Sequence, residues 1–347
     1  MNDLLIIDST LRDGSHAIGH QLTAKNICDY AKGAELAGIH LLIVGHGNGL
    51  GASSLQLGMS LLSDNKMLSL AKKELKKTKL GAFLIPGFGT IKNDIDPAIS
   101  SGIDALLVAC HSTEANITRQ HIEYVTEKGL KAYGVLMMSH MIPVKELLTQ
   151  AKLMQDYGVV GVIIMDSAGS YLPSDVTEKI KGLVNGLKIN VGFHAHNNLG
   201  MAIANSIAAV QAGAKIIDAT SRGFGAGAGN CQLEVLVAVL QKMGYETNLD
   251  LYRLMDNSEK IIANIMKRPQ QISSISLASG LSGVFSGFAP HAKRAAERFG
   301  VDVRDILIEL GRRKVVAGQE DIIVDVAMYL AQKKKTKKEN YQIEALI

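Results

Sequence analysis

The sequence predicts an α/β fold, a (β/α)₈ TIM barrel followed by a helical C-terminal domain, and three observations support this prediction. Eight short apolar runs, rich in Val, Ile and Leu, recur up to residue 223 at intervals of roughly 25 to 40 residues. Amphipathic segments with helical periodicity lie between the runs, and several end on a glycine that suits a helix C-cap. Beyond about residue 240 the runs stop and only helical segments follow.

Each predicted strand is an apolar run that polar or glycine-rich residues follow. The runs are LLIIDST (4–10), IHLLIVGHG (39–47), KLGAFLIPG (79–87), IDALLVACH (103–111), LKAYGVLMMSH (130–140), GVVGVIIMDS (158–167), INVGFHAH (189–196) and KIIDATSRG (215–223). The segments between them, such as TRQHIEYVTEKG (118–129), place apolar residues at helical spacing. A strand and a helix in alternation eight times close into a barrel, for which residues 1–240 provide enough chain. An open, doubly wound sheet is the alternative.

The remaining residues, 241–347, are assigned to a helical C-terminal domain. Four segments there show helical periodicity: LYRLMDNSEKIIANIMKR (251–268), PHAKRAAERFG (290–300), DVRDILIELGRRK (302–314) and EDIIVDVAMYLAQKKKTKK (320–338). We expect this domain to pack on the barrel or on a second copy of the chain. Packing on a second copy would make the protein a homo-oligomer.

The composition is that of an ordinary globular protein, with 47% hydrophobic and 20% charged residues. The net charge is +4, partly from the run KKKTKK (333–338), and only 5% of residues are aromatic, which argues against a nucleic-acid-binding surface. The three cysteines lack CxxC spacing, which indicates reduced thiols and a cytoplasmic location. No signal-peptide pattern and no apolar run of about 18 residues occurs, so we expect neither secretion nor membrane insertion.

Ionisable and hydroxyl side chains gather where the predicted strands end. Active sites of such barrels form at the carboxyl ends of the strands, so residues there are candidates for chemistry. The candidates are Arg12, Asp13 and His16 after the first strand, His46 after the second, Ser167 after the sixth, and His194 and His196 at the end of the seventh. An apolar strand that leads directly into RDGSH (12–16) is typical of a strand that delivers reactive groups.

The motif FHAHNN (193–198) indicates metal binding. Residues i and i+2 of a strand face the same side, so His194 and His196 can present two imidazoles to one ion. With the carboxylate of Asp13 the set leaves positions open for water or substrate, as catalytic sites do. Mixed nitrogen and oxygen ligands suit Mn²⁺, with Mg²⁺, Co²⁺ or Zn²⁺ as alternatives. Taken alone, the motif is equally compatible with two hydrogen-bonded structural histidines.

Arg12 and His16 are the candidate catalytic groups. A buried arginine beside a metal ligand is costly unless an anion lies between them, which implies an anionic substrate oxygen. A metal ion and an arginine can stabilise an enolate, and His16 can act as general base, with a structural histidine as the alternative. The run GFGAGAGN (223–230) lies too late in the chain for a dinucleotide-binding fingerprint, so we expect Asn230 to turn inward as a ligand or positioning group.

Seven motifs together resemble the 4-hydroxy-2-oxovalerate aldolase family of the DRE-TIM metallolyases: TLRDGSHAIGHQ, HGNGLGASS, LIPGFGT, HSTEA, MDSAG, FHAHNNLGMAIANS and GFGAGAGNCQLEV. This resemblance implies a barrel with a helical C-terminal domain and a divalent ion, usually manganese, held by Asp13, His194 and His196. It further implies that Arg12 steadies a pyruvate enolate and that His16 takes the proton of the C4 hydroxyl. The implied reaction is reversible cleavage of a 4-hydroxy-2-oxo acid to pyruvate, or a related 2-oxo acid, and an aldehyde.

Three positions depart from the family pattern. Ile43 stands where the family has Glu, and Asn48 stands where it has the Asp of HGDG. Phe285, in GVFSGF (283–288), replaces a tyrosine that the family places over the substrate's C4 end, and it lacks the hydroxyl donor. We therefore expect an altered or larger aldehyde. The residues expected to contact substrate besides the catalytic groups are Ser167, Phe285, Asn230 and His46.

Members of this family commonly pair with an acylating aldehyde dehydrogenase, and the three departures argue against that partner here. Two other functions remain as alternatives: a Claisen-type acyl-CoA condensing or lyase enzyme of the same superfamily, and a non-catalytic regulatory subunit that uses the barrel as a scaffold. A requirement for acyl-CoA would identify the first, and failure to bind any divalent ion would favour the second.

Overall fold

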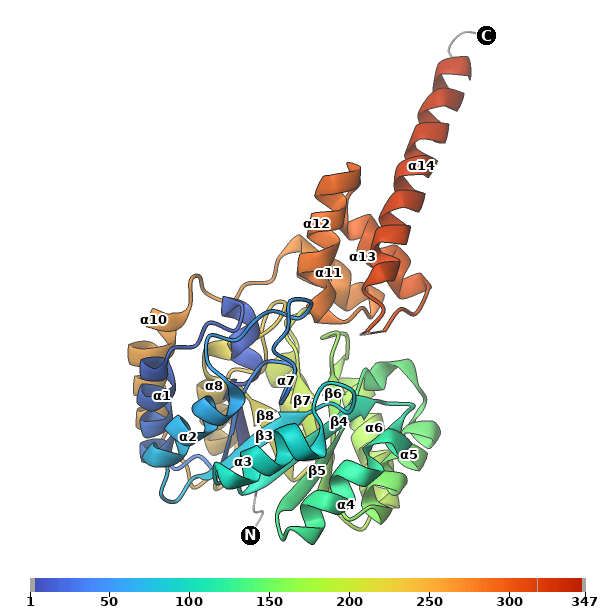
Figure 1. Cartoon of the computed structure of the whole chain (residues 1–347). Helices are drawn as coiled ribbons and strands as arrows, with labels where there is room; N and C mark the ends of the chain where they lie inside the picture. The colour runs from blue at the N-terminus through green and yellow to red at the C-terminus, as the bar shows by residue number, and fades with distance from the viewer. Residues whose placement is uncertain (1–3, 317, 345–347) are drawn as a thin grey trace.

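The computed structural model describes residues 4–316 and 318–344, and its centre is a closed barrel of eight parallel strands (Figure 1). Consecutive strands are neighbours, and β1 pairs with β8 to close the barrel. The strands are β1 (Leu5–Leu11), β2 (Leu41–Val44), β3 (Lys79–Leu84), β4 (Ala105–His111), β5 (Lys131–Met137), β6 (Gly161–Asp166), β7 (Asn190–Ala195) and β8 (Ile216–Ala219). The predicted TIM barrel is confirmed, since each strand overlaps one predicted run, and the doubly wound alternative is wrong.

Helices cover the outside of the barrel (Figure 1). In α1 (Ala24–Ala37) the sequence sets both ends, because Thr23 and Asn26 form a capping box and Gly38, at φ 77°, adopts the left-handed conformation of a C-cap. The other helices around the barrel are α2 (Asp64–Glu74), α3 (Asp96–Ser100), α4 (Arg119–Glu127), α5 (Val144–Asp156), α6 (Pro173–Gly186), α7 (Ala202–Gln211) and α8 (Leu233–Lys242). A short 3-10 helix, η1 (Asp13–Ile18), follows β1 directly.

The inside of the barrel is filled by side chains. Alternate strand residues point inward and form one apolar cluster, which comprises Ile7, Leu41, Ile43, Phe83, Ala105, Leu107, Ala109, Tyr133, Val135, Ile163, Met165 and Ile216. A larger cluster fills the space between the strands and the helices. Because the interior is packed, a ligand can bind only at the rim, where the strands end. Ile43, the first departure from the family pattern, belongs to this interior packing.

The chain after α8 forms two parts. α9 (Leu251–Asn257), η6 (Ser258–Ile262) and α10 (Ala263–Ile265) pack on the barrel, because Leu254 and Ile262 belong to its outer cluster. The helices α11 (Ser274–Ser282), α12 (Ala289–Phe299), α13 (Val303–Arg312) and α14 (Asp321–Glu344) enclose a separate core. Sequence periodicity missed α11. We propose that the domain boundary lies between Met266 and Ser273, whereas the sequence assignment placed it at residue 240.

The helical domain sits on the rim where the strands end, and α14 extends away from the barrel (Figure 1). Ser286 donates hydrogen bonds from its amide (3.3 Å) and its hydroxyl (3.1 Å) to the carbonyl of Ser167, just after β6. His140, just after β5, donates from Nε2 to the carbonyl of Gly283 (2.9 Å). Within the described residues, no helix has the length and apolar character needed to cross a membrane.

Candidate active site

The end of β1 delivers Arg12 and Asp13 to the rim as buried side chains, 3% and 2% exposed. Arg12 Nη1 donates to Asp13 Oδ2 at 2.8 Å. Burial raises the pKa of Asp13, but Arg12, and after it His196, outweigh this effect and hold that pKa well below its usual range. Asp13 is therefore an anion at neutral pH, as a metal ligand must be.

The predicted metal ligands lie together. One ligand atom from each of Asp13, His194 and His196 lies within 4.8 Å of the others. His194 Nδ1 donates to Asp218 Oδ2 (2.8 Å) and His196 Nδ1 donates to the carbonyl of Asp166 (3.0 Å). These bonds leave Nε2 of each ring as the free ligand atom, which is how metal-binding histidines are usually oriented.

Two buried polar atoms without a partner show that this donor set fits a metal ion. His194 Nε2 and Asn230 Oδ1 lack any hydrogen bond within the described part of the chain. Asn230 Nδ2 donates to Asp13 Oδ1 at 2.9 Å, so the expectation that Asn230 turns inward agrees with its position. A buried orphan nitrogen and a buried orphan oxygen beside a carboxylate cost free energy unless a cation or a donor engages them.

Arg12 also has unused donors. Its Nη1 donates to the carbonyl of Gly47 (3.3 Å), and its guanidinium carbon lies 4.4 Å from the ring centre of Phe83. Nη2 lies 3.8 Å from Asp218 Oδ2, and neither Nε nor Nη2 makes a hydrogen bond among the described residues. A buried guanidinium with two nitrogens free of hydrogen bonds is suited to an anionic oxygen.

Three imidazoles pack beside this centre. His16 lies edge-on to His20, with ring centres 4.9 Å apart, and His20 stacks on His46 at 3.7 Å. The ring of His16 also lies against Gly47, where an added Cβ would come within 2.4 Å of Nε2. His16 is therefore placed by the absence of a side chain at Gly47, in the loop after β2.

The loop after β2 uses both ring nitrogens of His46. Its Nδ1 accepts from the amide of Asn48 (3.0 Å) and its Nε2 donates to the carbonyl of Gly58 (3.0 Å). His46 therefore holds the loop rather than the metal ligands, and the amide of Asn48, the second departure, takes part through its backbone. His20, which the sequence prediction left out, packs edge-on against the ring of His16.

Acid should destabilise the metal-free protein through these imidazoles. Burial, followed by neighbouring histidines, lowers the pKa of His20 to about 3 and that of His46 to about 4. The unfolded chain, with a histidine pKa of about 6.5, takes up protons that the folded state rejects, so stability is full above pH 6.5 and is lost as pH falls toward 4. For His46 alone we expect a loss of about 2 kcal/mol at pH 5.

Denaturant unfolding of the wild type and of His46→Gln between pH 7 and pH 5 measures this loss. A glutamine can keep the bonds to Asn48 and Gly58 and does not titrate. The variant should therefore lose less stability over this range. Parallel losses in the two proteins would contradict the assignment.

Comparison with known proteins gives the family. Residues 3–261 match the HMGL-like family model, and residues 270–332 match the model described as a DmpG-like communication domain. The chain belongs to the HMGL-like family. It is 54% identical to a 4-hydroxy-2-oxovalerate aldolase of Spirochaeta aurantia, over 93% of this chain and 95% of that protein. It is 51% identical to a 4-hydroxy-2-oxovalerate aldolase of Pectobacterium atrosepticum, over 98% and 99% respectively.

A solved structure shares the fold. The carboxyl transferase domain of Rhizobium etli pyruvate carboxylase has a TM-score of 0.80 at 17% identity and covers 96% of this chain and 61% of that one. At this identity the likeness shows the fold alone. The curated relatives, in contrast, identify this HMGL-like chain as an aldolase-type carbon–carbon lyase. The function class predicted from the sequence motifs is confirmed.

Ser167 and Phe285, two residues expected to contact substrate, lie where the two domains meet. Ser167 Oγ accepts from the amide of Met138 (2.9 Å), and its carbonyl accepts from Ser286. Phe285 is half-buried, and its ring packs edge-on against Phe288 at 5.7 Å. Ser167 thus takes part in the attachment of the C-terminal domain, whereas Phe285 packs within that domain, and a contact with substrate remains a proposal for each.

Sequence reasoning missed Asp218 and Phe83. Asp218, 1% exposed, contacts both His194 and Arg12 and also accepts from Ser9 Oγ (3.0 Å). One signal was available, since an acid in the apolar run KIIDATSRG is unusual for a buried strand. Phe83 offered no such signal, because an aromatic residue in a strand is ordinarily part of the core.

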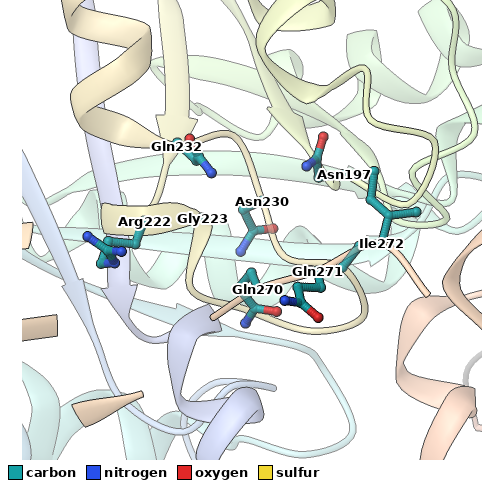
Figure 2. Close-up of a pocket in the computed structure, with 9 residues that line it drawn as sticks. Asn197, Arg222, Gly223, Asn230, Gln232, Gln270, Gln271 and Ile272 are labelled. Carbon is teal, nitrogen blue, oxygen red and sulfur yellow. The ribbon is translucent and has the colours of Figure 1, made fainter. Parts of the chain in front are cut away.

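A cavity of about 430 Å³ is lined in part by the glycine-rich loop 223–230 (Figure 2). Arg222, Gln232 and Gln270 are among the residues that line it. Asn230 belongs to both places, since it lines the cavity and donates to Asp13. Residues 270–272, which lead into the C-terminal domain, form part of the wall, and none of Asp13, His194 and His196 is among the lining residues.

Proposed function

We propose that the protein is a metal-dependent aldolase that reversibly cleaves a 4-hydroxy-2-oxo acid to pyruvate, or a related 2-oxo acid, and an aldehyde. The observation that carries the proposal is the buried group Asp13, His194 and His196 beside an arginine with two unused donors. The relatives named 4-hydroxy-2-oxovalerate aldolase support this substrate class.

Asp13, His194 and His196 would hold the divalent ion, and Asn230 Oδ1 is a further oxygen available on the same side. Mn²⁺ is the proposed ion because it accepts mixed nitrogen and oxygen ligands and open coordination, with Mg²⁺, Co²⁺ and Zn²⁺ as alternatives. When bound, the ion supplies positive charge that stabilises an enolate oxygen.

His16 would transfer the proton, and Arg12 would stabilise the negative charge that develops. His16 takes the proton of the C4 hydroxyl, the C3–C4 bond breaks, and its electron pair passes into the enolate while C4 becomes the aldehyde carbonyl. The free N–H groups of Arg12 donate to the developing enolate oxygen. The enolate then gains a proton at C3 from solvent to give pyruvate, and protonated His16 returns its proton to solvent, so that no net proton is consumed. His46, Ser167 and Phe285 are proposed to shape the surrounding pocket.

Deuterium exchange into the methyl group of pyruvate, followed by proton NMR in D₂O, tests this function without knowledge of the aldehyde. Exchange requires only enolate formation, so we expect it with the wild-type protein and Mn²⁺ and not with the metal-chelated protein. A methyl signal that stays fully protonated while Mn²⁺ is bound would show that pyruvate is the wrong donor. Exchange that needs acyl-CoA would favour a Claisen-type enzyme.

We also propose an acylating aldehyde dehydrogenase as the protein partner. The three departures argued against it, but the match of residues 270–332 to a communication-domain model favours a partner at this domain. Exposed apolar side chains on its helices, Leu281 at 78% and Met328 at 44%, support a docking role. Gel filtration with such a dehydrogenase should show a complex, and separate elution at micromolar concentrations would contradict the pairing.

A further inference from the structure

The glycine-rich loop 223–230 touches the metal ligand Asp13 directly. Asn230 Nδ2 (2.9 Å) and the amide of Ala226 (3.3 Å) both donate to Asp13 Oδ1. At Gly225 an added Cβ would lie 2.6 Å from Asp13 Oδ1 and 2.0 Å from Asn230 Nδ2. The loop backbone therefore lies close against the ligand, and the position of the loop sets how the Asp13 carboxylate is aimed.

The linker to the C-terminal domain, between Met266 and Ser273, contacts this loop near Gly225. Gln270 Nε2 donates to the carbonyl of Gly225 at 2.9 Å. The side chain of Gln270 also packs against the loop, since an added Cβ at Gly229 would lie 3.1 Å from its Cγ. Figure 2 shows Gln270 next to Asn230 among the residues that line the cavity.

Asn198 holds the loop at a second place and joins it to the C-terminal domain. It is fully buried, and its Oδ1 accepts from the amide of Ala228 (3.0 Å). Its Nδ2 donates to Ser286 Oγ (2.8 Å) and to the carbonyl of Ala168 (2.9 Å). The atom near Ala228 must accept a hydrogen bond and the atom near Ser286 must donate one, so the side-chain amide of Asn198 has a single orientation. Ser286 in turn donates to Ser167.

The loop packs closely at this contact. At Gly227, an added Cβ would lie 2.7 Å from Asn198 Oδ1 and 3.2 Å from the Cβ of Ser286. The loop, the amide of Asn198 and the first turn after Phe285 thus form one packed unit. Movement of Ser286 would leave a buried N–H of Asn198 unpaired, which costs free energy and allows the amide to turn.

We propose that Asn198 and Ser286 are positioning residues through which the C-terminal domain holds loop 223–230 against Asp13 and so sets the affinity for the metal ion. The inference rests on the proposed function in one respect, that a divalent ion binds at Asp13. Gln270 acts in the same direction from the linker. The C-terminal domain is accordingly part of the support of the metal centre, although it supplies none of the proposed ligands.

Manganese titration of the full-length protein, with free Mn²⁺ followed by electron paramagnetic resonance, tests this role without turnover. Asn198→Ala and Ser286→Ala should each raise the Kd for Mn²⁺ by about 3- to 10-fold, less than the 10- to 100-fold known for direct partners of metal ligands. Gln270→Ala should give a smaller rise. Because Gln270 is not in the core, this variant and Ser286→Ala carry the test if Asn198→Ala fails to fold.

Two matched controls separate this role from general loosening of the domain. Ser279→Ala removes a bond within the same domain, from Oγ to the carbonyl of Val284 (2.8 Å). His140→Ala removes a bond across the same domain junction, to Gly283, without touching the loop. Both controls should keep the wild-type Kd for Mn²⁺.

Linkage supplies a second readout. If the junction sets the affinity for the ion, the ion must stabilise the junction by the same free energy. Saturating Mn²⁺ should therefore slow hydrogen exchange at the amide of Ser286, and this effect should be lost in Asn198→Ala.

The outcomes are distinguishable. Equal Kd values in the wild type, Asn198→Ala and Ser286→Ala would overturn this inference and leave the proposed function standing. Equal weakening by the two controls would overturn it as well, because the effect would then come from general loosening. A wild-type protein that binds no Mn²⁺ would overturn the proposed function and this inference together.

Discussion

Replacing Arg12 by lysine should lower kcat/KM by about two to three orders of magnitude, the range seen when a preorganised donor to a developing anion is removed. The guanidinium is held by Asp13, by the carbonyl of Gly47 and by the face of Phe83, which leaves Nε and Nη2 free for substrate. A lysine keeps the charge but has neither the planar shape that packs on Phe83 nor a rigid fork of donors on separate nitrogens. Steady-state kinetics of pyruvate-forming cleavage measures the change.

The pattern of the change matters as much as its size. Because the interaction is made mainly with the enolate, kcat should fall with kcat/KM, and KM should change little. Arg119→Ala, which breaks an exposed ion pair with Glu123 on α4, serves as a control and should leave the kinetics unchanged. Full activity in Arg12→Lys would show that a positive charge suffices, and the role assigned to the guanidinium would then be wrong.

Asp13→Ala should abolish measurable Mn²⁺ binding at micromolar metal and, with it, pyruvate exchange. The variant loses one of three proposed ligands and the counter-charge of buried Arg12, so its stability should also fall by about 3 kcal/mol. Asp13→Asn keeps an oxygen in place without the charge and should show weak binding with a smaller loss of stability. Isothermal titration calorimetry and denaturant unfolding measure the two effects separately.

Asp218→Asn provides the graded comparison. The substitution keeps the size of the side chain but replaces the carboxylate that accepts the hydrogen bond from His194 Nδ1. Because that bond orients the His194 ring, the Kd for Mn²⁺ should rise by about 10- to 100-fold. A Kd equal to that of the wild type in Asp218→Asn would contradict the role of this pair. Mn²⁺ binding by Asp13→Ala at wild-type affinity would contradict the metal centre itself.

The barrel and the metal motif could be predicted because each depends on a local pattern. Eight continuous apolar runs that alternate with amphipathic helical segments allow few other arrangements. His194 and His196 share a face because of strand geometry alone, and Asp13 follows the carboxyl end of β1 at the same rim of the barrel. These features depend on residues close together in the sequence and not on how distant segments pack. A single sequence is therefore enough to identify them.

The features that were missed depend on contacts between distant segments. Asp218 contacts His194 and Arg12 only because β8 lies between β7 and β1 in the closed barrel. Phe83 reaches Arg12 across the barrel mouth, and His46 turns into its own loop. The positions of such residues in the sequence do not show that they lie close together in space.

The domain arrangement follows the same rule. Helical periodicity predicted α9, α12, α13 and α14, but it could not show that α9 packs on the barrel while α12 to α14 share a separate core with α11. That division depends on which apolar faces meet.

The amino-acid sequence by itself determined the barrel through its periodicity and the reaction class through the resemblance of its motifs to a known family, and its residue types predicted the groups proposed to bind metal and substrate. Only the tertiary structure decided how these groups are oriented: Asp218 aims His194, and Asn198 joins the glycine-rich loop to Ser286. The physical reason is that orientation at the site arises from hydrogen bonds between segments up to about two hundred residues apart, whose meeting only the closed fold establishes.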